Sequence, residues 1–136
     1  MEQGYIYIRR NNWYDMYNAC KLGKTSNLPD RNSQYITGEI ERGYFYSIFR
    51  VDIIFLNQIE NELQNEFIDY NIYKKGGIEF YSIKIINLIE PFLKNKNYKY
   101  YTLTQIEINN LIHCTYDKNY KKLNMQLENI IKPNLV

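Results

Sequence analysis

The sequence predicts an α+β fold, namely a small antiparallel three-stranded sheet flanked by helices, followed by a C-terminal helical extension. Two patterns support this fold class. Apolar side chains recur at helical spacing over residues 52–70, which is typical of an amphipathic helix. Side chains alternate between two faces with a period of two, as in half-buried strands, over residues 4–10, 18–24 and 44–51.

The first two strands are expected to form a hairpin. Tyr5 and Tyr7 share one face of the first strand, and Lys21 and Gly23 share one face of the second. Antiparallel pairing brings these four residues onto the same surface, so we expect Tyr7 and Lys21 side by side. The polar residues 10–15 between the strands predict a loop or hairpin connection.

Helices and short connections account for the middle of the chain. A run of N-cap residues at positions 25–27 precedes a short helix over residues 28–35. Residues 78–82 follow a two-glycine turn and are long enough only for a brief strand or an ordered connection. Residues 82–94 have helical spacing, and Pro91 limits the regularity of that helix.

The C-terminal part has a different composition. Residues 94–101 are rich in Lys and Asn and predict a linker, after which Thr102 caps a helix and residues 120–131 form another. We therefore expect one domain over residues 1–93 and a helical extension over residues 94–136. The extension is a candidate connection to a following domain in a longer protein.

Composition bounds the class of function. The chain has 136 residues, 45% of them hydrophobic, so a folded domain with one core is expected. The net charge of +2, from 17 Lys and Arg against 15 Asp and Glu, permits a polyanionic partner without requiring one. Without a signal peptide or an apolar run of about 20 residues, we expect an intracellular protein that is neither secreted nor in a membrane.

Two short motifs and three later residues stand in order along the chain: Tyr5-Ile6-Tyr7, Lys21-Leu22-Gly23, Arg31, Tyr35 and Glu79. This order resembles the GIY-YIG nuclease domain over residues 4 to about 90. The first motif stands where that family has Gly-Ile-Tyr, and the second where it has Tyr-Ile-Gly. The longer sequence Cys-Lys-Leu-Gly-Lys-Thr from position 20 is similar to a phage and large-DNA-virus branch with a Lys-Ile-Gly-Lys-Thr-like second motif.

The resemblance implies a role for each matched residue. Glu79 matches the single carboxylate that holds one divalent ion, Mg²⁺ or Mn²⁺, against the scissile phosphate, and hard cations do prefer oxygen ligands. Tyr7 matches the residue that activates the attacking water. Arg31 matches the residue that binds the phosphate and stabilises the transition state, a task for which a planar guanidinium is suited. Tyr35 matches a position that points toward the scissile phosphate.

Two departures from the family pattern leave the identity of the general base open. Tyr5 replaces the first glycine, and Lys21 replaces the second tyrosine, as is typical of the viral branch. A phenol has an ordinary pKa of about 10, so it needs a nearby cation or metal-bound water to act as a base near neutral pH. The base is therefore Tyr7 alone or Tyr7 assisted by Lys21, and the lysine is alternatively only a phosphate contact.

The resemblance implies a metal-dependent endonuclease that hydrolyses DNA phosphodiester bonds. The alternative is a catalytically inactive nucleic-acid-binding module of a larger viral or phage protein, and each site residue taken singly also has an ordinary structural explanation. By analogy with viral fusions, a fused or associated helicase-like domain is a candidate partner, and the cytoplasm of a host cell or a viral factory is the expected location. The residues expected to contact nucleic acid outside the catalytic set are Tyr5, Lys24, Arg42, Lys74 and Lys75.

Overall fold

The fold is a single antiparallel sheet with helices on both faces, seen in a computed structural model that describes residues 3–72, 79–114 and 117–131. The strands are β1 (Gln3–Arg10), β2 (Ala19–Thr25), β3 (Tyr44–Asp52), β4 (Phe80–Ser82) and β5 (Tyr100–Thr102). The α-helices in the described parts are α1 (Asn12–Met16), α2 (Leu28–Gly38), α3 (Leu56–Glu66), α5 (Ile89–Asn95), α6 (Gln105–Ile112) and α7 (Asp117–Ile131). Three 3-10 helices complete this set: η1 (Ile53–Phe55), η2 (Ile68–Tyr70) and η3 (Ile83–Asn87).

The sheet has the strand order β4-β2-β1-β3-β5, with every neighbouring pair antiparallel. The predicted α+β class is confirmed, and the three predicted strands are the central ones. The sheet has five strands rather than three, because β4 and β5 extend it at the two edges. Each edge strand has only three residues, too few to show a period of two.

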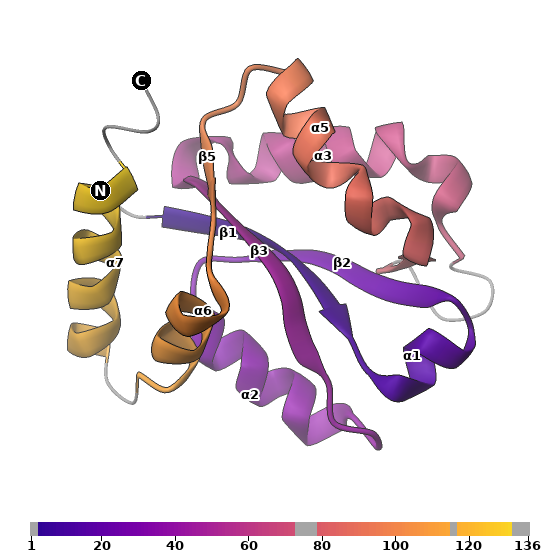
Figure 1. Cartoon of the computed structure of the whole chain (residues 1–136), viewed down its shortest axis with the longest axis horizontal. Coiled ribbons are helices and arrows are strands. Elements are labelled where there is room, and N and C mark those ends of the chain that lie inside the picture. Colours follow the sequence, from indigo (N-terminus) through magenta and orange to yellow (C-terminus); the bar gives the residue numbers. More distant parts are fainter. Residues whose placement is uncertain (1–2, 73–78, 115–116, 132–136) are drawn as a thin grey trace.

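Each face of the sheet carries its own core. Figure 1 shows α3 and α5 together beyond one side of the strands, and α2 and α6 on the other. The first core contains Ile6, Ile8, Leu22, Ile59, Leu63 and Leu93 among its buried residues. The second core contains Tyr5, Tyr7, Leu28, Tyr35, Ile108, Leu111, Tyr120 and Leu127. The period-two pattern of β1 thus separates its tyrosines from its isoleucines, as predicted.

The predicted loop at residues 10–15 is in fact the short helix α1. Asn11 is its N-cap, and the Asn11 side chain accepts a hydrogen bond of 2.7 Å from the backbone N–H of Tyr14. A side-chain cap satisfies an N–H that the first turn of a helix otherwise leaves without a partner. The paired asparagines that indicated a loop therefore begin a helix.

Two predicted helices are interrupted. Residues 52–70 form η1, α3 and η2 in succession. Residues 82–94 form η3 and then α5, with Pro91 in the first turn of α5, where its missing N–H costs little. The predicted cap at Thr102 is also shifted, because Thr104 caps α6 through a capping box with Glu107.

Residues after 93 build part of this fold. They supply β5 to the sheet and, through α6 and α7, four of the buried residues of the second core. The division of the chain into residues 1–93 and 94–136 stays a prediction. No helix in the described ranges is long and apolar enough to cross a membrane.

Candidate active site

Tyr7 lies at the centre of the sheet. It pairs with Gly23 of β2 and with Ile48 of β3, and its side chain is fully buried. A Cβ atom added at Gly23 would lie 2.5 Å from the Tyr7 hydroxyl oxygen and 2.7 Å from the ring carbon that bears it. The glycine of the second motif therefore leaves the space that the phenol of the first motif fills.

A chain of hydrogen bonds runs from Tyr7 to the predicted metal ligand. The hydroxyl oxygens of Tyr7 and Tyr35 are 2.7 Å apart, and the Tyr35 hydroxyl donates to Glu79 Oε2 at 3.3 Å. Because a hydroxyl has one proton, Tyr35 accepts from Tyr7 while it donates to the carboxylate. We call this chain, Tyr7 to Tyr35 to Glu79, the tyrosine relay. Its members come from β1, from α2 and from the residue before β4.

Burial keeps the two phenols protonated at neutral pH. Burial raises the pKa of Tyr7 to about 12, although the hydrogen bond with Tyr35 and the charge of Arg31 act in the opposite direction. Burial also raises the pKa of Tyr35 well above its ordinary range, and the neighbouring Tyr7 and Glu79 raise it further. Neither phenol is a phenolate near neutral pH in this arrangement, so both act as hydrogen-bonding groups.

Arg31 brings positive charge to the relay from one helical turn before Tyr35. Its guanidinium is half-buried and donates to the backbone carbonyl of Lys24 at 3.3 Å. Its positive charge acts against the rise in the pKa of Tyr7 and of Tyr35 that burial causes. The structure thus links Tyr7, Tyr35 and Glu79 by hydrogen bonds and places Arg31 on the same helix as Tyr35, and the role of this arginine stays a prediction.

Lys21 lies beside Tyr35 rather than beside Tyr7. In the hairpin Lys21 pairs with Arg9, while Gly23 takes the place opposite Tyr7, so the expected side-by-side pair was wrong by two residues along the strand. The ammonium nitrogen of Lys21 lies 5.0 Å from the centre of the Tyr35 ring and 4.8 Å from that of Phe80. These are cation–π distances, and they place the lysine beside Tyr35, the middle member of the relay.

The ion pair between Arg9 and Glu39, which the sequence did not predict, packs against the relay at Tyr35. Arg9 is fully buried and donates to Glu39 through Nε at 2.9 Å and through a terminal nitrogen at 2.7 Å. The guanidinium carbon also lies 4.5 Å from the centre of the Tyr35 ring. Arg9 shares the face of Tyr5 and Tyr7 by the period of two, which is the signal that identifies it.

The predicted nucleic-acid contacts have different surroundings. Tyr5 is fully buried in the second core and its hydroxyl donates to the side chain of Asn124, so it offers no surface to nucleic acid and that prediction is corrected. Lys24 forms an ion pair of 3.0 Å with Glu60, whereas Arg42 is exposed. Lys74 and Lys75 lie outside the described residues.

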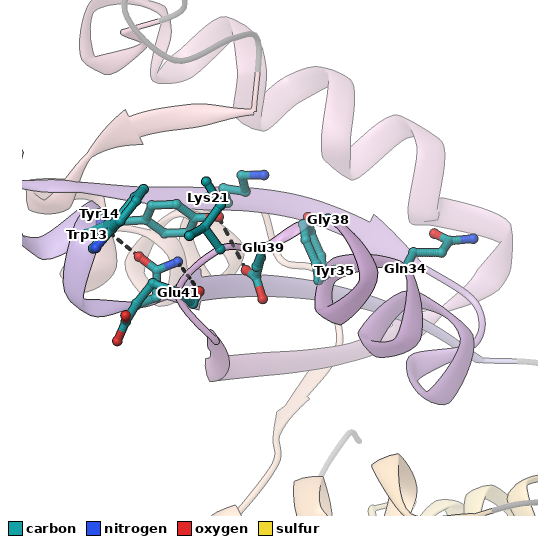
Figure 2. A pocket seen from close by; sticks show the side chains of 10 residues that line it. Trp13, Tyr14, Lys21, Gln34, Tyr35, Gly38, Glu39 and Glu41 are labelled. Atoms are coloured by element: carbon teal, nitrogen blue, oxygen red, sulfur yellow. Dashed lines mark hydrogen bonds between the residues drawn. The ribbon is translucent and has the colours of Figure 1, made fainter.

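A pocket of about 340 Å³ opens beside the relay, between α1, β2 and the end of α2. Figure 2 shows Tyr14 and Glu39 joined across it by a hydrogen bond, which measures 3.3 Å. The lining residues are Asn11, Trp13, Tyr14, Lys21, Gln34, Tyr35, Gly38, Glu39, Ile40 and Glu41. Trp13 and Tyr14 come from the helix that replaced the predicted loop, so their role in a site was not foreseen.

The donor set near Glu79 suits a cation held by few protein ligands. Among the described residues no group of three or more His, Cys, Asp and Glu side chains lies together. Glu79 is half-buried, and one of its oxygens accepts from Tyr35. A cation such as Mg²⁺ keeps several waters and takes one or two carboxylates plus phosphate oxygens, so one half-exposed carboxylate is compatible with it.

The α+β fold gathers a sheet tyrosine, a tyrosine of α2 and a single carboxylate, with Arg31 on the same helix as Tyr35. A comparison with protein families gives the class of protein, a nuclease-like or DNA-binding module. The chain belongs to the T5orf172 domain family, whose model matches residues 4–96. This domain is found in homing-endonuclease-like proteins of phages and bacteria and is related to GIY-YIG-type nucleases. No curated protein and no solved structure matches the chain.

Proposed function

We propose that this protein is a metal-dependent endonuclease that hydrolyses DNA phosphodiester bonds. The observation that carries the proposal is the tyrosine relay, which ends on the half-exposed carboxylate of Glu79, with Arg31 one helical turn before Tyr35. Glu79 would hold Mg²⁺ or Mn²⁺, and such an ion would supply positive charge to the scissile phosphate and lower the pKa of the attacking water. Arg31 binds the same phosphate and stabilises the charge that grows on it.

Tyr7 acts through Tyr35 in this proposal. The Tyr7 hydroxyl is buried, protonated and engaged with Tyr35, so it orients the Tyr35 hydroxyl, which in turn holds Glu79. Tyr7 is thus a positioning residue, and the role of water activation falls to groups nearer the surface. Lys21, which lies over the ring of Tyr35, contacts phosphate in this proposal.

The decisive experiment removes the charge of Glu79. Purified protein with Mg²⁺ or Mn²⁺ is expected to nick or cut plasmid DNA, and Glu79→Gln is expected to abolish cutting while DNA binding remains. The matched control is Glu66→Gln, an exposed glutamate of α3 that keeps full activity. Cutting retained by Glu79→Gln contradicts the role of this carboxylate.

A second candidate function is a catalytically inactive nucleic-acid-binding module of a larger viral or phage protein. The complete burial of Tyr7, the residue matched to water activation, favours it. A module of this kind shifts DNA in gels and gives no product with any divalent ion. A fused or associated helicase-like domain stays a prediction, which isolation of the protein with its neighbours would test.

A further inference from the structure

The pocket beside the relay is lined by aromatic side chains against which a flat aromatic ring can stack. We propose that it takes one unpaired nucleobase of the DNA, adjacent to the phosphate at Glu79 and Arg31. This inference rests on the proposed function and specifies its substrate class. The pocket volume of about 340 Å³ is at the lower end of the range for small-ligand sites.

Two aromatic side chains give the pocket its stacking surfaces. Trp13 is 47% exposed although it is the largest apolar side chain of α1. Tyr14 is held in place, because its ring packs edge-on against Phe80 with centroids 5.0 Å apart and its hydroxyl donates to Glu39. An exposed tryptophan next to a fixed tyrosine is a stacking platform, since every nucleobase offers a π-face.

Most polar groups of the lining are already used within the protein. Glu39 accepts from Arg9, Tyr14 and the backbone of Gly43. The amide of Asn11 bonds the backbone of Glu41 and of Tyr14. The lining therefore offers few groups that read the edge of a base, and we expect little preference among the four bases.

Two polar side chains of the lining remain for the ligand. Within the described residues Lys21 has aromatic neighbours but no carboxylate partner, and the exposed Gln34 makes no hydrogen bond. Lys21 suits the phosphate that joins the stacked nucleotide to the scissile bond. A base reaches this pocket only when it has left the helical stack, so the substrate is DNA with an unpaired nucleotide.

The chain's single tryptophan allows a direct test in solution. The full chain in EDTA, where no cutting occurs, is titrated with a short thymidine strand, with a duplex carrying one unpaired base, and with the fully paired duplex. We expect the emission of Trp13 to be quenched by the first two and unchanged by the third. Equal quenching by paired and unpaired DNA overturns the inference.

Affinity variants separate stacking from general binding. With a labelled strand and anisotropy as the readout, Trp13→Ala is expected to weaken binding about 5- to 150-fold, the range for loss of one stacked base. Trp13→Phe keeps a ring and most of the affinity. Met16→Ala, at a position 76% exposed on the same helix, binds like the unaltered chain.

The outcomes distinguish this inference from the proposed function. Unchanged affinity of Trp13→Ala for unpaired DNA overturns the base pocket, and the Glu79→Gln result still decides the nuclease. Quenching by unpaired DNA without any metal-dependent cutting supports the pocket and contradicts the nuclease. Absence of binding to every one of these DNAs overturns both.

Discussion

At the scale of single residues, the space over Gly23 decides the geometry of the site. The Tyr7 hydroxyl oxygen lies only 2.5 Å from the position that a Cβ would take, so Gly23→Ala forces the phenol or the strand to move. We expect a loss of about 1–3 kcal/mol in the free energy of unfolding, as for other overpacked cores, together with loss of cutting. Urea denaturation and plasmid cleavage measure the two effects.

Gly38 provides the matched control. A Cβ there meets nothing within 4 Å, and the residue ends α2. Gly38→Ala is expected to be neutral or to stabilise by about 0.5–1 kcal/mol, because alanine has the higher helix propensity. If both alanine variants have the same stability, the close contact between Gly23 and Tyr7 is not a feature of the protein in solution.

The buried hydroxyl of Tyr7 also predicts how the free energy of unfolding depends on pH. The pKa of Tyr7 is raised to about 12 in the folded protein, above its ordinary value near 10 in an unfolded chain. A raised pKa means that the stabilising contribution is complete below pH 10 and is lost as pH rises through 12. At about 1.4 kcal/mol per pKa unit, Tyr7 alone accounts for about 2–3 kcal/mol of that loss.

The variant Tyr7→Phe tests the contribution of the Tyr7 hydroxyl to the pH dependence of stability. The variant lacks the titrating hydroxyl, so its free energy of unfolding should fall less steeply between pH 9 and 11 than that of the unaltered chain. Denaturant titrations at several pH values measure the two slopes. Identical slopes contradict the assignment of a raised pKa to Tyr7.

At this scale the sequence identified the site residues that belong to recognisable motifs. It did not identify the residues whose role depends only on packing. Tyr7, Arg31, Tyr35 and Glu79 stand in a recognisable order, and the structure links Tyr7, Tyr35 and Glu79 by hydrogen bonds. Arg9 belongs to no motif, although its place in the alternation of β1 puts it on the same face. The error about Lys21 was one of register, which the length and shape of the connection set and composition does not.

At the scale of elements, a side chain of α7 caps the N-terminus of α2. The Tyr120 hydroxyl accepts from the backbone N–H of Leu28 at 3.3 Å and donates to the carbonyl of Ser26 at 3.2 Å. The first N–H groups of a helix lack partners within the helix, so this hydroxyl acts as a cap supplied from far along the chain. Tyr120→Phe is expected to cost about 1–3 kcal/mol of stability, measured by urea denaturation.

Met125→Ala tests whether that cost is specific. Met125 is on the same helix and 63% exposed, so its truncation should change the free energy of unfolding by less than about 0.5 kcal/mol. A similar loss for both variants indicates a general sensitivity of α7 rather than a cap on α2.

The central strands and α2 were predictable, a brief strand at residues 78–82 was one of two alternatives, and β5 and α1 were missed. The central strands and α2 have enough residues for a periodic pattern and a cap, and the structure places them within a few residues of their predicted bounds. The edge strands β4 and β5 exist because a neighbouring strand accepts their hydrogen bonds, a tertiary effect that three residues do not encode. The same holds for α1, which depends on the single cap of Asn11.

At the scale of the whole molecule, the matched family region and the folded unit have different extents. The family model ends at residue 96, yet the second core includes Ile108, Leu111, Tyr120 and Leu127. A chain cut after residue 96 leaves Tyr5 and Leu28 without these partners. We expect it to lose cooperative unfolding or to unfold at much lower denaturant than the full chain, as followed by circular dichroism. Equal midpoints would instead support an independent domain over residues 1–93.

The distribution of charge over the molecule predicts weak dependence of DNA binding on salt. Three cations of the first strands, Arg9, Arg10 and Lys24, already face carboxylates, which among the described residues leaves Lys21, Arg31 and Arg42 as candidate phosphate contacts. Three phosphate contacts give a slope of about −3 for the logarithm of the binding constant against that of salt concentration.

Arg42→Ala tests this count of phosphate contacts. Because Arg42 is exposed and follows the pocket residue Glu41, removing its charge should reduce the slope by about one unit. Lys122→Ala is the control, since Lys122 is exposed on α7, which lies at the opposite end of the molecule from α1 (Figure 1). Anisotropy titrations in EDTA over a range of salt concentrations measure both variants. A larger effect of Lys122→Ala than of Arg42→Ala places the DNA on α7 and away from the tyrosine relay.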